Sequence, residues 1–347
     1  MYNICNNEVK QLQIERIDKE RYGYDITALS MYAFQYTLVG EKLEEKIAEL
    51  QDQEVLGIFD NEKIAAKVQI RDLHIFQNDK VIKMGGIQSV ATYPEYRRQG
   101  YVKKLLIAAL KDMREMGYLV SMLHPFSIHF YRKFGYEILS DQQQLVLTQA
   151  DLKPLPAENQ NGKIRRFNQN EYHEDLMSVY EQYAKKHNGM LKRTKKWWQA
   201  YIIKERTAAI YYDENNQARG YILYDIANQK MTVKELIVTN QSARIALWNF
   251  ICQHDSMLDE IVLHLSKHEQ LTYLINNPQQ NIITSPYFMV RIVNVEKYLQ
   301  QYPFHICQEE FIFYVSDDCA PWNQGYYKIA NGSVEKLNEQ VQSEKIV

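Results

Sequence analysis

Residues 89–117 read SVATYPEYRRQGYVKKLLIAALKDMREMG, and this stretch predicts a strand, a loop and an amphipathic helix in that order. The apolar positions of the helix recur at the spacing of a single helix face, with charged side chains on the other face. They are Val102, Leu105, Leu106, Ala109, Leu110 and Met113. Gly117 stands where a left-handed residue commonly ends a helix. The stretch therefore predicts one strand–loop–helix unit of an α/β fold.

The loop in this unit places Arg97, Arg98 and Gly100 directly before the helix. Amides at a helix start, the helix dipole and two guanidinium groups together favour an anionic ligand such as a phosphate. Taken alone, the same residues more often form a solvated turn, and the loop is neither a GK[ST]-type phosphate loop nor a GxGxxG turn. The surrounding sequence has to decide between the two readings.

The chain around this unit alternates strand-like and helix-like segments. In the first 140 or so residues we expect a helix over 24–36 with Asp25 as its N-cap, strands over 55–59, 63–76, 84–92 and 118–123, and a short helix over 127–134 that ends at Gly135. Residues 140–162 are polar and contain two prolines, so we predict a connection between domains there.

The next block, residues 163–286, repeats the same order of elements. We expect a helix over 172–187, strands over 208–213, 220–225 and 234–238, and a helix over 242–252. The second strand–helix junction, at residues 239–240, contains no glycine, which a close approach of backbone to phosphate favours. We therefore predict a second copy of the fold without nucleotide binding. A third unit follows, with a strand-like segment at 309–315 and a turn-rich one at 320–325.

Composition narrows the class of protein. The chain has 347 residues, 41 Lys and Arg against 43 Asp and Glu, and no apolar run as long as the ~18 residues of a membrane span. This balance gives no general drive toward nucleic acid or a membrane surface. The four cysteines lack CxxC spacing, and no signal peptide is apparent. We expect reduced thiols, a cytoplasmic location, and no nucleic-acid or membrane partner.

Two motifs carry a resemblance to a known family. RRQGYV at 97–102 matches the acetyl-CoA signature Q/R-x-x-G-x-G/A through Gly100, with Val102 replacing the small sixth residue, and FYRKFGY at 130–136 matches a later segment. In this the chain resembles the GNAT superfamily of N-acetyltransferases. Together with HPFSIHFYRKFGYEI, NGMLKRTKKWW and APWNQG, the motifs resemble the enhanced-intracellular-survival (Eis) family over nearly the whole chain.

The resemblance implies an α/β (α+β) architecture of tandem GNAT folds. It implies an N-terminal GNAT catalytic domain over 1–145, a degenerate GNAT domain over 160–286, and a partial, shortened sterol-carrier-protein-like domain over 287–347. It further implies acetyl-CoA as co-substrate, no metal, a primary amine as acceptor (of an aminoglycoside or another small polyamine) and a homo-oligomer, with hexamers known in the family. A non-catalytic ligand-binding scaffold built from the same folds is the alternative function.

The site residues are also carried over from the resemblance. Tyr131 is the implied general acid that protonates the departing thiolate. The implied acetyl-CoA contacts comprise a strand end, the loop and helix start, and a segment across the cofactor: Val90, Ala91, Thr92, Arg97, Arg98, Gln99, Gly100, Tyr101, Val102, Lys103, Phe126 and Ser127. A core position for Tyr131 is the alternative.

The general base stays open in the sequence. In the Eis family it is the C-terminal carboxylate, but here the chain ends at Val347, soon after APWNQG. We expect either a truncated or a shortened member, and Val347 receives no role as the base. Water or His124 is a substitute, and a structural cap is an equal reading for His124.

Other features have a structural reading beside the functional one. Trp197 and Trp198 either frame the substrate entrance or pack in a core. Tyr32, Phe34 and Tyr36 either line the acceptor cleft, where Asp25 would attract a cationic amine, or simply pack on their helix, and packing is favoured for most of them. The charged run of Lys192, Arg193, Lys195 and Lys196 is expected to form a solvated face. His264 and His268 are expected to bind no metal, because the segment around His264 is predicted to be a strand.

Overall fold

The computed structural model describes residues 13–156, 162–275, 281–304 and 309–337. The chain divides into two compact units. The first comprises residues 1–73, 83–137 and 289–347, and the second comprises residues 74–82 and 138–288. Both are built on the same plan, and each is described by itself.

The sheet of the first unit runs in the order β1-β2-β3-β4-β5-β12. Its strands are β1 (Ile14–Arg16), β2 (Gln53–Asp60), β3 (Lys63–Gln77), β4 (Lys80–Thr92), β5 (Val120–Leu123) and β12 (Asn281–Ile292). Its helices are α1 (Lys19–Phe34), α2 (Glu41–Ala48), α3 (Tyr101–Glu115), α4 (Ile128–Arg132) and α8 (Val295–Gln301). β4 and β5 are parallel, whereas β5 and β12 are antiparallel.

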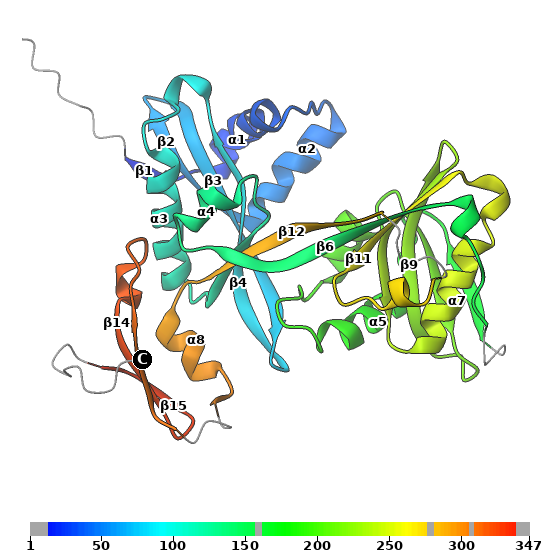
Figure 1. Ribbon diagram of the computed structural model, residues 1–347. Helices are drawn as coiled ribbons and strands as arrows, with labels where there is room; N and C mark the ends of the chain where they lie inside the picture. Colours follow the sequence, from blue (N-terminus) through cyan, green and yellow to red (C-terminus); the bar gives the residue numbers. More distant parts are fainter. Residues whose placement is uncertain (1–12, 157–161, 276–280, 305–308, 338–347) are drawn as a thin grey trace, which may run out of the picture. The chain divides into compact units, whose positions relative to one another are not determined.

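Helices cover both faces of this sheet (Figure 1). On one face, Leu105, Leu106 and other residues of α3 pack against Leu56 and Ile58 of β2. On the opposite face, Ile26 and Leu29 of α1 pack in a separate cluster. Because successive side chains of a strand point to opposite faces, β2, β3 and β4 each contribute to both clusters.

The second unit repeats this arrangement with the order β6-β11-β10-β9-β8-β7. The strands are β6 (Glu137–Thr148), β7 (Lys163–Phe167), β8 (Thr207–Tyr212), β9 (Ala218–Ala227), β10 (Lys230–Val238) and β11 (Glu260–Ser266). The helices are α5 (Glu174–Ala184), α6 (Lys195–Trp197) and α7 (Gln241–Cys252). α7 packs on one face and α5 on the other, and β10 pairs in parallel with β11. The predicted repeat of the strand–loop–helix unit is thereby confirmed.

A small antiparallel sheet completes the first unit. It contains β13 (Phe311–Val315), β14 (Gly325–Ala330) and β15 (Ser333–Leu337), and a 3-10 turn at Pro321–Asn323 precedes β14. Trp322 Nε1 donates to the Val293 carbonyl at 2.8 Å, and the Val295 amide donates to Asn323 Oδ1 at 3.0 Å. These bonds hold the turn against the chain that follows β12, and the expected strand and turn in this segment are confirmed.

Three details differ from the sequence predictions. The N-cap of the first helix is Asp18, not Asp25, because Asp18 Oδ1 accepts from the amides of Glu20 (3.0 Å) and Arg21 (3.3 Å), and Asp25 lies within the helix. The polar segment expected as a connection continues as β6 to Thr148, because Leu145 and Leu147 alternate into the core. The expected boundary between residues 286 and 287 falls inside β12.

Candidate acetyl-CoA site

The site begins where β4 extends beyond its pairing with β5. The parallel pairing of β4 with β5 ends at Gly86 opposite Met122, although β4 continues to Thr92. Ser89 lies in the left-handed region at φ 52°, which interrupts regular strand geometry at a non-glycine residue. Val90, Ala91 and Thr92 all lie beyond this point, and Thr92 Oγ1 is buried without a hydrogen-bond partner among the described residues. The end of β4 thus offers polar groups to a ligand that would lie along the strand.

The loop before α3 turns through two left-handed residues, Arg98 at φ 64° and Gly100 at φ 76°. A Cβ atom at Gly100 would meet nothing within 4 Å, so the positive φ, and not crowding, accounts for the glycine. Gly100 is the N-cap and supplies no side-chain hydrogen bond. The first amides of α3, from Tyr101 to Lys103, therefore remain available to an acceptor from outside the helix.

Charges around this helix start leave it positive. The one acidic residue of the loop, Glu95, binds Lys63 Nζ at 2.9 Å. Arg97, Arg98 and Lys103 are exposed, and Arg97 Nε donates to the Thr92 carbonyl at 3.3 Å, which links the loop to the end of β4. Free amides, the dipole of α3 and these cations match the needs of a pyrophosphate.

Two further loop residues have partners inside the protein. The Tyr101 hydroxyl donates to Gln99 Oε1 at 2.7 Å, and Gln99 Nε2 donates to the Glu95 carbonyl at 3.3 Å. Val102 packs its side chain against the core cluster beneath α3. The residue that departs from the family signature therefore leaves its backbone amide, not its side chain, for a ligand.

Tyr131 lies on α4, whose N-cap Ser127 accepts a hydrogen bond from the Phe130 amide at 3.3 Å. The Tyr131 ring is 4% exposed and packs against Phe126 (ring centroids 5.4 Å apart) and Tyr136 (6.0 Å). Burial raises the pKa of the Tyr131 phenol to about 12. The phenol consequently stays protonated over the whole neutral range, as a general acid requires.

Phe126 is 75% exposed, although Tyr131 beside it is buried. Exposure of a large apolar ring beside a buried phenol suits contact with a ligand.

His124, the histidine considered as a base, lies exposed directly after β5.

A polar group that sequence reasoning missed lies on the α1 face of the sheet. Lys67 of β3 is fully buried, and its Nζ donates to Ser30 Oγ (2.8 Å), Ser89 Oγ (2.9 Å) and the Ser89 carbonyl (3.2 Å). Ser30 Oγ and Ser89 Oγ lie 2.9 Å apart. Burial lowers the pKa of Lys67 to about 7. The available signal was a lone lysine inside the apolar run IAAKVQI at 64–70.

The aromatic residues of α1 and the segment after it do not behave as simple packing residues. Tyr32 is 55% exposed and Phe34 51% exposed, and the Tyr32 ring lies 5.5 Å from that of Tyr93. The expectation of helix packing is wrong for these two, because the core-facing stripe of α1 consists of other residues. Tyr36 is half-buried.

In the second unit, two sequence readings are decided by burial. Trp198 is fully buried against Tyr180 and Tyr221, so the core reading is correct for it. Arg193 is not part of a solvated face, because it forms an ion pair with Glu235 at 2.7 Å while both side chains are largely covered. His264 lies on strand β11 as predicted.

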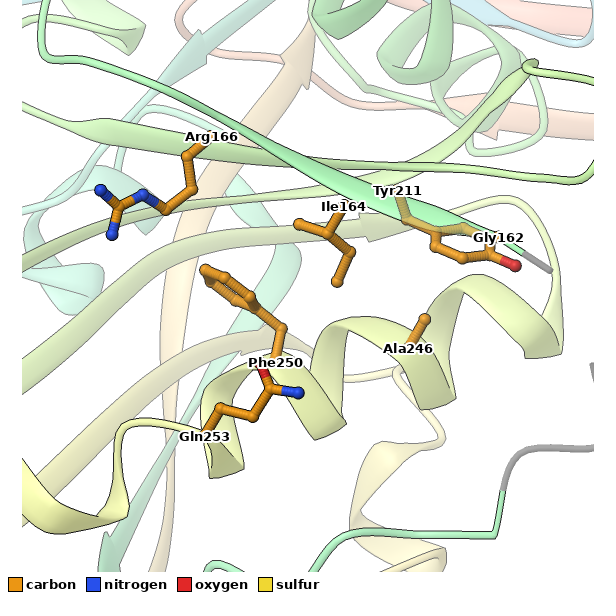
Figure 2. Close-up of a pocket in the computed structure, with 7 residues that line it drawn as sticks. All are labelled: Gly162, Ile164, Arg166, Tyr211, Ala246, Phe250 and Gln253. Carbon is orange, nitrogen blue, oxygen red and sulfur yellow. The ribbon is translucent and has the colours of Figure 1, made fainter. Parts of the chain in front are cut away.

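In the second unit, the corresponding helix α7 has a side-chain cap at its start. Asn240 is the N-cap of α7, and its Oδ1 accepts from the Ala243 amide at 2.9 Å. A hollow of about 480 Å³ does lie beside α7 (Figure 2), lined by Gly162, Ile164, Arg166, Tyr211, Ala246, Phe250 and Gln253. Its residues come from the side and the end of α7, from β7 with the residue before it, and from β8, so it is not equivalent to the helix start of the first unit.

Several absences concern only the part of the chain that the structure describes. Within it, no three His, Cys, Asp or Glu side chains are grouped to hold a metal ion, and no helix is both long and apolar enough to cross a bilayer. Cys252 and Cys319 are buried free thiols, as expected. Cys5, Cys307 and Val347 lie outside the described residues.

Comparison with family models identifies the domains. Residues 15–139 and residues 189–292 each match an acetyltransferase (GNAT) domain, and residues 295–346 match a sterol carrier protein domain. No functionally curated protein sequence matches the chain significantly.

Solved structures match nearly the whole chain. A conserved protein of unknown function from Enterococcus faecalis V583, described as a probable N-acyltransferase, has 27% identity and a TM-score of 0.87, over 94% of this chain and 85% of its own. A GCN5-related N-acetyltransferase from Anabaena variabilis has 22% identity and a TM-score of 0.81, over 95% and 86%. Eis1 from Mycobacterium abscessus has 17% identity and a TM-score of 0.76, over 94% and 85%. The last two show the shared fold.

Proposed function

This chain is a tandem-GNAT protein with a C-terminal sterol carrier protein domain, and we propose that its first GNAT domain moves the acetyl group of acetyl-CoA to a primary amine. The observation that carries the proposal is the uncapped start of α3 after two left-handed residues, flanked by Arg97 and Arg98. Backbone amides that the helix cannot satisfy are matched there with positive charge, as pyrophosphate binding needs.

Different residues of the site would bind different parts of acetyl-CoA. The amides of Tyr101, Val102 and Lys103 and the guanidinium groups of Arg97 and Arg98 would bind the pyrophosphate, with Gln99 and Gly100 shaping the turn. Val90, Ala91 and Thr92 would bind the pantetheine chain along β4 and place the thioester carbonyl against a backbone amide, where developing negative charge is stabilised. Phe126 and Ser127 would close the opposite side.

Tyr131 would act as the general acid. When the amine nitrogen bonds to the carbonyl carbon, the C–S bond breaks and the thiolate needs a proton. The buried phenol holds one throughout the neutral pH range. The exposed rings of Tyr32 and Phe34 would contact the acceptor from α1.

The finer features expected from the resemblance belong to the same proposal. We infer an aminoglycoside or another small polyamine as acceptor, a hexameric assembly, a cytoplasmic location, and a second GNAT domain that does not bind acetyl-CoA. The capped start of α7 supports the last of these.

Two measurements test the proposal. Acetyl-CoA at about 100 times its dissociation constant should stabilise the protein by about 2.7 kcal/mol in thermal unfolding. Thiol release should then appear with at least one of kanamycin A, spermidine and n-butylamine. No thermal shift at saturating acetyl-CoA would overturn the proposal, and a shift without turnover of any amine would favour a ligand-binding scaffold.

A further inference from the structure

The buried lysine of the first domain is not explained by packing. Lys67 is fully buried, and its Nζ donates to the hydroxyls of Ser30 and Ser89 and to the Ser89 carbonyl. All three acceptors are uncharged oxygens, so none of these contacts is an ion pair. Buried ammonium groups are normally paired with a carboxylate, so this environment favours an amine that can lose its proton.

The three partners suit either protonation state. An ammonium group has three protons for three oxygen acceptors. When one proton leaves, either serine hydroxyl can rotate and donate to the lone pair of the amine, because a hydroxyl is both donor and acceptor. The network can therefore take up or release a proton without leaving a polar group unsatisfied.

Charged groups around the network oppose a permanent charge on Lys67. Lys46 of α2 repels it. Lys46 itself pairs with Glu49 at 3.0 Å, and Glu49 also binds Arg71 at 3.2 Å.

The network also reaches the site. Ser89 is half-exposed and directly precedes Val90, where β4 offers its backbone to the thioester. The buried amine is thus connected through the single hydroxyl of Ser89 to the part of β4 that lies at the proposed site.

We propose that Lys67 is the proton acceptor that deprotonates the incoming ammonium group, acting through the hydroxyls of Ser89 and Ser30. This rests on the proposed acetyltransferase function. The ammonium of the acceptor gives a proton to a serine hydroxyl as that hydroxyl gives its own to Lys67. The neutral nitrogen then forms the C–N bond, the C–S bond breaks, and the thiolate takes the proton of Tyr131. The second nitrogen proton restores Tyr131, and Lys67 returns its proton to solvent through the hydroxyl network.

The test compares pH profiles of Lys67→Met and the wild type. kcat/KM is measured by thiol release from about pH 6 to about pH 10 with the fastest of kanamycin A, spermidine and n-butylamine. We expect the variant to lose about 100-fold near neutral pH, and the loss to shrink as alkaline pH deprotonates the amine directly. A loss that stays constant across pH would mean that Lys67 only holds the strand in shape, and an unchanged profile would mean no role; either overturns the inference.

Controls separate this inference from the proposed function. Lys111→Met, on the exposed face of α3, should keep the wild-type profile. Lys67→Met should keep the acetyl-CoA thermal shift, which shows that the variant folds and binds. Independently, carbon-13 NMR of the wild-type Lys67 Cε should show a titration midpoint near neutral pH, and a midpoint close to that of an ordinary lysine would overturn the inference even if no amine is turned over. An absent acetyl-CoA shift in the wild type would instead overturn the proposed function.

Discussion

The two GNAT domains contain the same strand–loop–helix unit, but the start of its helix is capped in only one of them. In the first, α3 starts at Gly100, which offers no side-chain cap, after a turn with two left-handed residues. In the second, α7 starts at Asn240, whose side chain already accepts an amide hydrogen bond from Ala243. The fold requires a helix at this place in both domains. Whether the helix start can bind an anion depends on whether its amides are left unsatisfied.

The same contrast appears on the opposite faces of the sheets, beneath α1 and α5. In the first domain, a lysine and two serines from β3, α1 and β4 form a network of hydroxyl contacts. In the second, Glu235 of β10 binds Arg193 at 2.7 Å and Tyr221 of β9 at 2.8 Å. The ion pair of Arg193 and Glu235 keeps each group in one protonation state, whereas the serine hydroxyls around the Lys67 amine can pass protons to it and take them back. The difference separates a structural centre from one suited to chemistry.

The largest expected effect tests whether only the first domain catalyses. Tyr131→Phe should lower kcat by about 10²- to 10⁴-fold, because the departing thiolate loses its proton donor. Acetyl-CoA affinity, measured by calorimetry, should remain unchanged. Tyr136→Phe is the matched control, since that hydroxyl contacts Ser121 in the core and should leave kcat close to the wild type. Full activity of Tyr131→Phe would remove Tyr131 from the mechanism.

The next effect tests the structural centre of the second domain. Glu235→Gln leaves the Arg193 guanidinium buried without a counter-charge, and should lower the free energy of unfolding by about 3–5 kcal/mol. Denaturant titration measures this change. Glu62→Gln removes the partner of Arg21 in a pair that is 61% and 84% exposed, and should change stability by less than about 1 kcal/mol. Equal effects of the two substitutions would mean that the buried ion pair contributes no more to the free energy of unfolding than the exposed one.

A smaller effect compares the two helix starts directly. Gly100→Ala should weaken acetyl-CoA binding about tenfold, because an L-residue resists the left-handed conformation by roughly 1–2 kcal/mol and the turn that aims the amides relaxes. Asn240→Ala should cost about 1 kcal/mol of stability through loss of the cap, with acetyl-CoA affinity unchanged. Calorimetry reports both affinities. A second equivalent of acetyl-CoA bound by either protein would contradict the difference between the domains.

The last effect concerns pH and stability. Burial lowers the pKa of Lys67 to about 7, below the ordinary lysine value, so between the two values the unfolded chain binds a proton that the folded chain lacks. Stability should therefore rise with pH in this window, by up to about 1.4 kcal/mol per pH unit. Denaturant titrations at about pH 7, 8 and 9 should show this rise for the wild type relative to Lys67→Met. Parallel curves would contradict a lowered pKa.

Sequence predicted most of the elements because their signals are local. The apolar stripe of α3 and the repeated order of strands and helices appear in the folded chain as expected. The errors have identifiable causes. The predicted helix started too late, at residue 24, because the first turn of α1 is polar and lacks an apolar pattern. The glutamines of β6 likewise masked a strand whose buried positions are Leu145 and Leu147.

The sequence by itself determined that two copies of one fold are present and that only the first keeps a glycine between strand and helix, because periodicity and turn residues act over a few neighbours. Tertiary structure alone decided which polar residues are buried. Lys67 meets Ser30 and Ser89, at separations of 37 and 22 residues, and Arg193 meets Glu235 at 42, so neither environment can be read from adjacent residues. Burial then sets their protonation, since the cost of an unpaired charge depends on what surrounds it and not on the order of the chain.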